Sequence, residues 1–184
     1  MFRQWIPDAY YQSLAQVPIQ DLFRRGYRVA LLDIDNTLAA HGSSFGQDYA
    51  HAQVDRFQAA GFQVYILSNA FQHRAESFGQ DFGVTIIGDA GKPGTKGVER
   101  ALQESGARRE ELLLFGDQLF TDVWSGTRAG IMTVLLDRLS THEPWYIHLK
   151  RIGERFVKYA TKTRAHFDRI PEVSSEIDEK KVNL

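Results

Sequence analysis

The chain contains no cysteine, and this absence removes several kinds of chemistry at once. Without a thiol it can form no disulfide, no thiolate metal site and no covalent bond to substrate through sulfur. Enzymes that depend on a cysteine nucleophile are therefore excluded, and any catalysis must use oxygen or nitrogen groups.

Long apolar runs and an excess of charge are missing as well. No stretch approaches the roughly 20 apolar residues that span a bilayer, and Met1–Asp8 lacks the apolar core of a secretory signal. The 22 basic residues nearly balance the 23 acidic ones, so nothing in the overall charge favours nucleic acid. We expect a cytoplasmic protein with no nucleic-acid partner.

The 184 residues, 43% of them hydrophobic, suffice for one domain with a core and short appendages. Apolar runs typical of buried strands occupy Tyr27–Ile34, Phe62–Leu67, Val84–Gly88, Leu112–Phe115 and Ile131–Leu136. Segments with helical spacing lie between them: Gln47–Ala60, Phe71–Phe82, Thr95–Ser105 and Phe120–Ala129. This alternation predicts a three-layer, Rossmann-like α/β fold with about five parallel strands and helices on both faces.

The same pattern divides the chain into four parts. Residues 1–26 are predicted to form a helical extension, with a helix over Pro7–Phe23, and residues 27–140 to form the α/β core. Residues 141–170 are predicted to contain a basic amphipathic helix, and the polar residues 171–184 a flexible tail.

Two aspartates separated by one residue end the first strand of the core. Asp33 and Asp35 follow the apolar run Ala30–Leu32 and precede Asn-Thr. In parallel α/β sheets ligands bind just beyond the carboxyl ends of the strands. Neighbouring carboxylates repel each other, so such a pair indicates a metal ion or a division into acid and nucleophile. A lone Asp-x-Asp is also compatible with a cap or a turn, and the other strand ends decide between these interpretations.

Three more polar signals fall at the predicted ends of later strands. Ser68 and Asn69 follow the second strand, Lys92 lies in the loop after the third, and Asp117 and Asp122 follow the fourth. Because the carboxyl ends of parallel strands meet at one edge, all of these side chains should converge there.

This set suits phosphoryl transfer. Carboxylate oxygens are the ligands that Mg²⁺ prefers, while an ammonium and a hydroxyl can offset the charge of a bound phosphoryl group. Asp33 could attack phosphorus and form an aspartyl phosphate, while Asp35 could act as the general acid and base. Ser68, Asn69 and Lys92 would bind the phosphate.

The combination Asp33-x-Asp35-x-Thr37, Ser68, Lys92-Pro93 and Gly116-Asp117-x4-Asp122 resembles the four motifs of the haloacid dehalogenase superfamily. The resemblance implies that Asp33 is the nucleophile, and the second acid, Asp35, places the chain with the phosphatases. It also implies that Mg²⁺ is held by the Asp33 carboxylate, the Asp35 carbonyl and Asp117. Asp122 would then orient a metal-bound water or Lys92.

Further marks are similar to those of the YqeG-type subfamily, a capless group related to phosphatidylglycerophosphate phosphatases. They are the Asp-Asn-Thr-Leu sequence from Asp35, the Lys-Pro third motif, the Pro-Asp-x-Tyr start at Pro7, and Arg151 with Glu154-Arg155. The resemblance implies a phosphorylated substrate, with phosphatidylglycerophosphate favoured and a soluble phosphomonoester or phosphoprotein as the alternative. Asn69-Ala70 departs from the Ser-Asn-Asn expected after the second strand.

The spacing of the motifs leaves no room for a cap domain. About 30 residues separate Asp35 from Ser68, and about 24 separate Ser68 from Lys92. One strand and one helix occupy each interval. Unless a partner supplies a cap, we therefore expect an open site, suited to a phosphate carried by a large molecule such as a lipid headgroup or a protein.

Several alternatives stay open. Lys96 could supply the ammonium in place of Lys92, although a solvated position in the first turn of the next helix suits it better. Thr121 fits a role in shaping the turn between Asp117 and Asp122 better than a substrate contact. The chain could also be a non-catalytic module that binds a phosphate to regulate a partner, but a module of that kind would not need Asp35.

The basic amphipathic segment, residues 145–164, carries six cations and one acid, with aromatic and aliphatic residues at helical spacing. Such a helix can lie on anionic lipid, which predicts peripheral association at the inner face of the membrane. The alternative, which the sequence favours slightly, is that its apolar stripe packs on the core while the cations face water.

Overall fold

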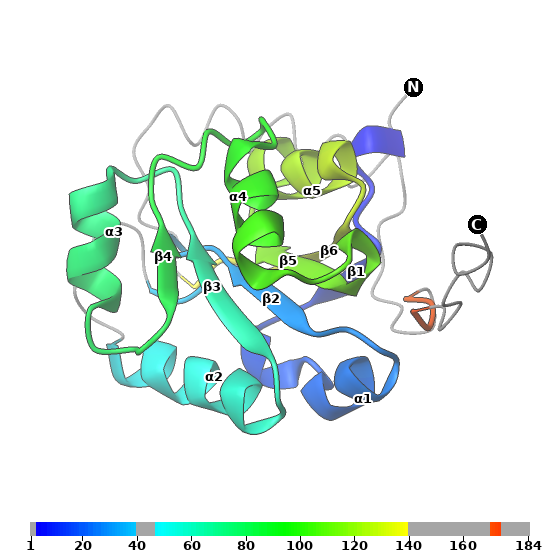
Figure 1. The fold of residues 1–184 in the computed structure, drawn as a ribbon, viewed down its shortest axis with the longest axis horizontal. Coiled ribbons are helices and arrows are strands. Elements are labelled where there is room, and N and C mark those ends of the chain that lie inside the picture. The colour runs from blue at the N-terminus through cyan, green and yellow to red at the C-terminus, as the bar shows by residue number, and fades with distance from the viewer. Residues whose placement is uncertain (1–2, 40–46, 140–169, 174–184) are drawn as a thin grey trace, which may run out of the picture.

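The computed structural model describes residues 3–39, 47–139 and 170–173 (Figure 1). Six strands form one parallel sheet in the order β1-β6-β5-β2-β3-β4. Their bounds are β1 Ala9–Tyr11, β2 Val29–Leu32, β3 Gln63–Leu67, β4 Thr85–Ile87, β5 Leu112–Gly116 and β6 Met132–Leu136. The predicted α/β class with a parallel sheet is confirmed.

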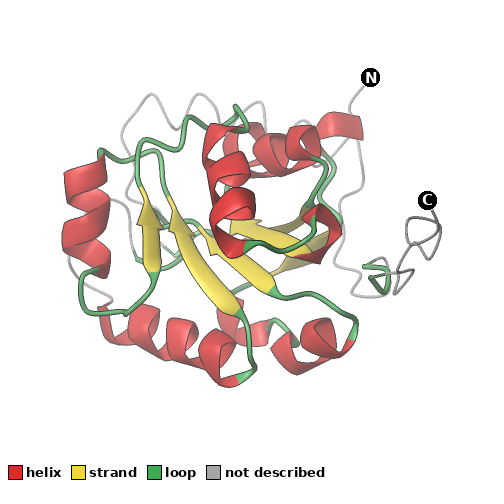
Figure 2. Ribbon diagram, viewed as in Figure 1, coloured by secondary structure: helices red, strands yellow, loops and turns green. Residues whose placement is uncertain are grey.

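Helices cover both faces of this sheet (Figure 2). Their bounds are α1 Ile19–Arg24, α2 Gln47–Ala59, α3 Gln72–Gly79, α4 Lys96–Ser105 and α5 Trp124–Ala129. Short single turns complete the elements: η1 Arg3–Trp5, η2 Leu14–Gln16, η3 Arg109–Glu111 and η4 Leu119–Val123. α1 and α2 lie on one face and α4 and α5 on the other, which makes the three layers of the predicted core (Figure 1).

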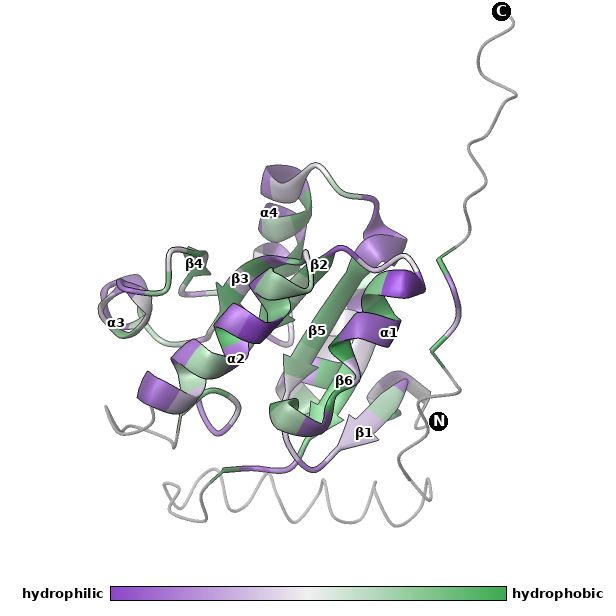
Figure 3. Ribbon diagram, turned by 90° about the horizontal axis from the view of Figure 1, so that it is seen from below, coloured by the Kyte–Doolittle hydropathy of each residue, from purple (hydrophilic) through white to green (hydrophobic). Residues whose placement is uncertain are grey.

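The central strands are apolar at every position because both of their faces are buried. In β2, Ala30 and Leu32 pack into the core shared with α1 and α2, whereas Val29 and Leu31 pack into the core shared with α4 and α5. Figure 3 shows the same strands as a hydrophobic band between more polar helices.

The predicted helix over Pro7–Phe23 is wrong in its first half. Ala9–Tyr11 form β1, an edge strand of the sheet that pairs in parallel with β6. The α-helix is restricted to Ile19–Arg24. The Tyr10 hydroxyl donates a hydrogen bond of 2.5 Å to Asp137, just beyond β6, and this contact helps to hold the segment against the sheet. The sheet therefore has six strands where the sequence predicted about five.

Most of the chain beyond residue 140 lies outside the described residues. The predicted amphipathic helix of residues 145–164 and most of the predicted tail, 171–184, therefore stay predictions. The short described segment 170–173 packs beside α1, with Ile170 fully buried and the Val173 amide donating to the Arg25 carbonyl at 2.7 Å. Across the described ranges, no helix has the length and apolar character to cross a membrane.

Candidate active site

The carboxyl ends of two central strands bring the first acidic residues together. Asp33 directly follows β2 and Asp117 directly follows β5, its neighbour in the sheet. The Asp33 amide donates to the Phe115 carbonyl at 3.0 Å, which continues the ladder to the last residue before the turn. The two carboxylates are thus held on adjacent loops at the edge where parallel sheets bind ligands.

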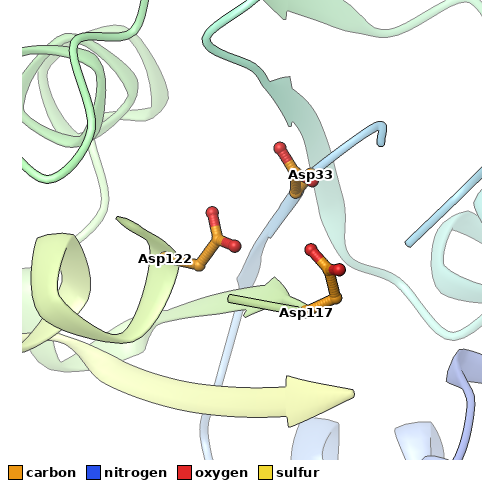
Figure 4. A group of neighbouring side chains, drawn as sticks. All are labelled: Asp33, Asp117 and Asp122. Carbon is orange, nitrogen blue, oxygen red and sulfur yellow. The ribbon is translucent and has the colours of Figure 1, made fainter. Parts of the chain in front are cut away.

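Asp33, Asp117 and Asp122 form a buried cluster (Figure 4). One carboxylate oxygen from each lies within 4.8 Å of the other two, and the residues are only 5%, 1% and 2% exposed. Carboxylates this close repel one another in a dry environment, so the arrangement requires positive charge. The structure thus brings together three of the acids that the sequence predicted to converge.

Lys92 supplies part of that charge. Its Nζ donates to Asp33 Oδ1 at 2.6 Å, to Asp122 Oδ1 at 2.6 Å and to the Leu67 carbonyl at 2.9 Å, and its side chain is 2% exposed. All three ammonium donors therefore have partners. The alternative ammonium, Lys96, is exposed in the first turn of α4, as its predicted solvated position requires.

The pKa values in this cluster reflect burial first and neighbouring charge second. Burial alone would lower the pKa of Lys92, but the carboxylates of Asp122 and Asp33 outweigh it, so this pKa is raised and the ammonium stays charged. Burial raises the pKa of Asp33 well above its ordinary value; Lys92 opposes this shift, while Asp122 and Asp117 add to it. One ammonium faces three carboxylates, so the cluster keeps an excess of negative charge and favours a further cation.

Asp122 is positioned by a π-helical turn. The Val123 amide reaches back to the Gln118 carbonyl, and the Gln118 amide donates to Asp122 Oδ2 at 3.1 Å. A Cβ on Gly116 would lie 2.3 Å from Asp122 Cγ, so only glycine permits this close approach. The Thr121 hydroxyl also lies 3.4 Å from Asp122 Oδ2, which agrees with its predicted role in the turn.

Ser68 and Asn69 follow β3 and face the same edge. Ser68 is 1% exposed, and its hydroxyl oxygen accepts the Ala70 amide hydrogen at 3.1 Å. The Asn69 side chain donates to the Lys92 carbonyl and accepts from the Lys92 amide, both at 2.8 Å. Asn69 therefore fixes the loop that carries Lys92, a role that the sequence did not reveal, and its predicted contact with phosphate stays a prediction.

The Asp35 carboxylate is not a member of the cluster of three acids. It is 17% exposed, and its Oδ1 accepts a hydrogen bond of 2.9 Å from Nη2 of Arg74, in the first turn of α3. Arg74 is a functional candidate that belongs to none of the sequence motifs. The only signal for it was its position in the helix that follows Ser68.

A Rossmann-like sheet that ends in carboxylates and a buried lysine is an arrangement suited to phosphoryl transfer. The model of the family "haloacid dehalogenase-like hydrolase" matches residues 19–130, more than half of the chain. The chain therefore belongs to the haloacid dehalogenase-like hydrolases, and the prediction of a phosphatase in this family is confirmed.

Two relatives agree with this assignment, and one solved structure shares the fold. The chain is 26% identical over 162 residues to "Probable phosphatase YqeG" of Bacillus subtilis (strain 168), covering 88% of this chain and 94% of that protein. It is 27% identical over 155 residues to "Phosphatidylglycerophosphate phosphatase 1, chloroplastic/mitochondrial" of Arabidopsis thaliana, covering 79% of this chain but only 44% of that protein. An uncharacterized protein from Listeria monocytogenes serotype 4b shares the fold, with a TM-score of 0.50 at 17% identity, over 64% of this chain and 84% of that one.

Proposed function

We propose that this phosphatase hydrolyses phosphomonoesters through an aspartyl phosphate on Asp33, and that its substrate is phosphatidylglycerophosphate. The observation that carries the mechanism is the buried contact of Lys92 Nζ with both Asp33 and Asp122, beside Asp117. It presents an oxygen nucleophile next to a fixed positive charge, at the edge where a phosphoryl group can enter.

Two displacements at phosphorus make up the reaction. In the first, an Asp33 oxygen forms a bond to phosphorus, the ester P–O bond breaks, and Asp35 gives its proton to the departing alkoxide. In the second, water attacks phosphorus, Asp35 accepts a proton from it, and the bond between phosphorus and Asp33 breaks. Asp35 thus acts once as acid and once as base, and each half-reaction leaves the Asp35 carboxyl in the protonation state that the other half-reaction needs.

The charge and chemistry of the cluster fit a magnesium ion. Asp33, Asp117 and the Asp35 backbone carbonyl would hold it, since hard oxygen donors suit Mg²⁺. Both Asp122 oxygens already accept hydrogen bonds, from Lys92 and from the Gln118 amide, so a positioning role suits this residue. When bound, the ion supplies positive charge at the phosphoryl oxygens. The Ser68 hydroxyl and Lys92 would bind the phosphoryl group beside it, with Lys92 exchanging one of its three present contacts for a phosphoryl oxygen.

The lipid substrate is supported by the surroundings of the site. Phe71 follows the Ser68 loop and is 70% exposed; Leu139 donates its amide to the Asn36 carbonyl at 3.1 Å and is 41% exposed. These are the exposed large hydrophobic residues of the described part of the chain. The described residues between Asp35 and Lys92 form only α2, β3, α3 and β4, with no domain over the site. Apolar residues near these strand ends, with no cap domain among the described residues, suit a phosphate on an amphiphile, as does the substrate named for the Arabidopsis relative.

Turnover of phosphatidylglycerophosphate in detergent micelles, compared with a panel of soluble phosphomonoesters and phosphopeptides, tests the substrate. The expected result is Mg²⁺-dependent release of phosphate, with kcat/KM for the lipid above that for every soluble compound. The Asp33→Asn variant is the control for contaminating activity and should lose several orders of magnitude. Preference for a soluble compound would refute the lipid substrate and leave the phosphatase mechanism standing.

We further propose that a cytoplasmic enzyme meets this lipid at the inner face of the membrane through residues 145–164. The six cations of that segment could each contribute about 1 kcal/mol near an anionic surface. The protein should then pellet with anionic vesicles at low salt and stay in the supernatant with neutral vesicles. Equal behaviour with both kinds of vesicle would refute the membrane contact.

A further inference from the structure

Arg74 places a cation directly beside the proposed acid and base. Its Nη2 lies 2.9 Å from Asp35 Oδ1, and its side chain remains 45% exposed. Within the described part of the chain, Asp35 is the ion-pair partner of this guanidinium. An arginine carries five N–H donors in a rigid fork, so one contact with Asp35 leaves most of its donors available toward solvent.

The backbone around Arg74 is firmly fixed. The Gln72 amide, at the start of α3, donates to the Asp89 carboxylate at 3.0 Å, and the Gln72 side chain accepts the Gly88 amide hydrogen at 2.7 Å. The Arg74 amide donates to the Phe71 carbonyl at 3.0 Å. The first turn of α3 is therefore attached to the loop after β4, and Arg74 extends from a defined point.

We propose that Arg74 recognises a second anionic group on the leaving-group side of the substrate. This inference rests on the proposed function, in which Asp35 contacts the ester oxygen that departs. A guanidinium bonded to Asp35 then lies next to the leaving group, and its solvent-facing donors can bind an anion carried there. The ligand class is a phosphomonoester whose alcohol also carries a phosphodiester or a second phosphate. Phosphatidylglycerophosphate meets this description, since one glycerol unit joins its two phosphates.

A second anion matters because arginine binds phosphate oxygens through parallel hydrogen bonds. A hydrogen bond to a charged group corresponds to about a tenfold or larger change in binding, and partial exposure places Arg74 at the lower end of that range. An enzyme with this contact should discriminate between alcohols by their charge, independently of any acyl chain.

The experiment compares three substrates that differ by one feature at a time. Glycerol phosphate lacks the second anion, glycerophosphoglycerophosphate carries it without acyl chains, and dihexanoyl phosphatidylglycerophosphate carries both. The variants are Arg74→Gln, Arg74→Lys and, as a matched control, Arg100→Gln. Arg100 is also about half exposed, at 48%, and ion-paired to a carboxylate, Glu104, but it lies on α4. Steady-state kcat and KM are measured for each combination of variant and substrate, and the thermal midpoint of each variant reports folding.

For glycerophosphoglycerophosphate, Arg74→Gln should lower kcat/KM about tenfold more than it does for glycerol phosphate, mainly through KM. Arg74→Lys should recover part of this preference, because it keeps the charge but loses the fork. Arg100→Gln should match the wild type on all three substrates.

Equal losses on glycerol phosphate and glycerophosphoglycerophosphate would overturn the proposal, because Arg74 would then act only by positioning Asp35. Unchanged kinetics would overturn it too. If Arg74→Gln selectively lowers kcat/KM for glycerophosphoglycerophosphate while the acylated lipid is not turned over at all, the result would support the anion site and refute the lipid substrate. No turnover of any phosphomonoester would refute both the site and the proposed function.

Discussion

Replacing Lys92 by methionine tests how the acidic cluster is held together. Methionine keeps most of the length of the side chain but removes the ammonium that contacts Asp33 and Asp122 at 2.6 Å and the Leu67 carbonyl at 2.9 Å. Three buried carboxylates would remain without their cation. Removing one partner of a buried ion pair typically costs about 3–5 kcal/mol, because the remaining charge stays desolvated.

The structure places the expected loss near the lower end of that range. Burial already raises the pKa of Asp33, so this carboxyl can take up a proton when Lys92 is absent and relieve part of the repulsion. We expect Lys92→Met to lower the free energy of unfolding by about 3 kcal/mol near pH 7.5 in the presence of a chelator. This difference in unfolding free energy between Lys92→Met and the wild type should shrink toward pH 5, where protonating an acid of the cluster becomes easier.

Urea unfolding of the metal-free proteins measures this difference, with Lys96→Met as the matched control. Lys96 is exposed, so its replacement should change stability by less than about 0.5 kcal/mol and leave turnover intact. Lys92→Met should also lose at least about a hundredfold in kcat/KM, because the phosphate would lose a fixed positive charge. A destabilisation below about 1 kcal/mol, or an equal loss of activity in Lys96→Met, would refute this account of the cluster.

Three further predictions address other parts of the molecule. In Gly116→Ala, the new Cβ would lie 2.3 Å from Asp122 Cγ and push that carboxylate away from Lys92; kcat should fall at least about tenfold, and an unchanged kcat would show that the close approach is dispensable. EDTA should abolish turnover, Mg²⁺ should restore it, and Ca²⁺ should support little, since it prefers more ligands at longer distances; activity that survives excess chelator would contradict the magnesium site. Burial, and then the hydrogen bond to Asp137, raises the pKa of Tyr10 to about 12 from its ordinary 10.0, so the folded state holds this proton more tightly than the unfolded chain does. The resulting stability is complete below pH 10 and is lost as the pH rises toward 12. Tyr10→Phe should therefore reduce the pH dependence of the unfolding midpoint between pH 10 and 12. Parallel midpoint-against-pH curves for the wild type and the variant would disprove the contribution of Tyr10.

The convergence of the catalytic motifs could be predicted from the sequence because it follows from topology. In a parallel sheet every strand delivers its last residue to the same edge, so Asp33, Ser68 and Asp117 had to meet once their strands were identified. The buried strands themselves are continuous apolar runs, which are the clearest signal in the chain.

Other features depend on contacts between distant segments and carry no local signal. β1 is only three residues long and exists because it pairs with β6, more than 100 residues later. The Arg74–Asp35 pair joins residues 39 apart, and the Asn69–Lys92 pair joins residues 23 apart. Both depend on where a helix or loop begins to within one residue, which periodicity cannot determine.

The most direct test of the central claim is chemical trapping of the phosphorylated residue. Borohydride reduces an aspartyl phosphate to homoserine, so enzyme quenched during turnover of p-nitrophenyl phosphate and then reduced should yield a peptide with homoserine at position 33. The same treatment without substrate, or of Asp33→Asn with substrate, should leave that peptide unmodified. Homoserine at position 35, 117 or 122, or turnover by Asp33→Asn within tenfold of the wild type, would contradict the assignment of Asp33 as the nucleophile.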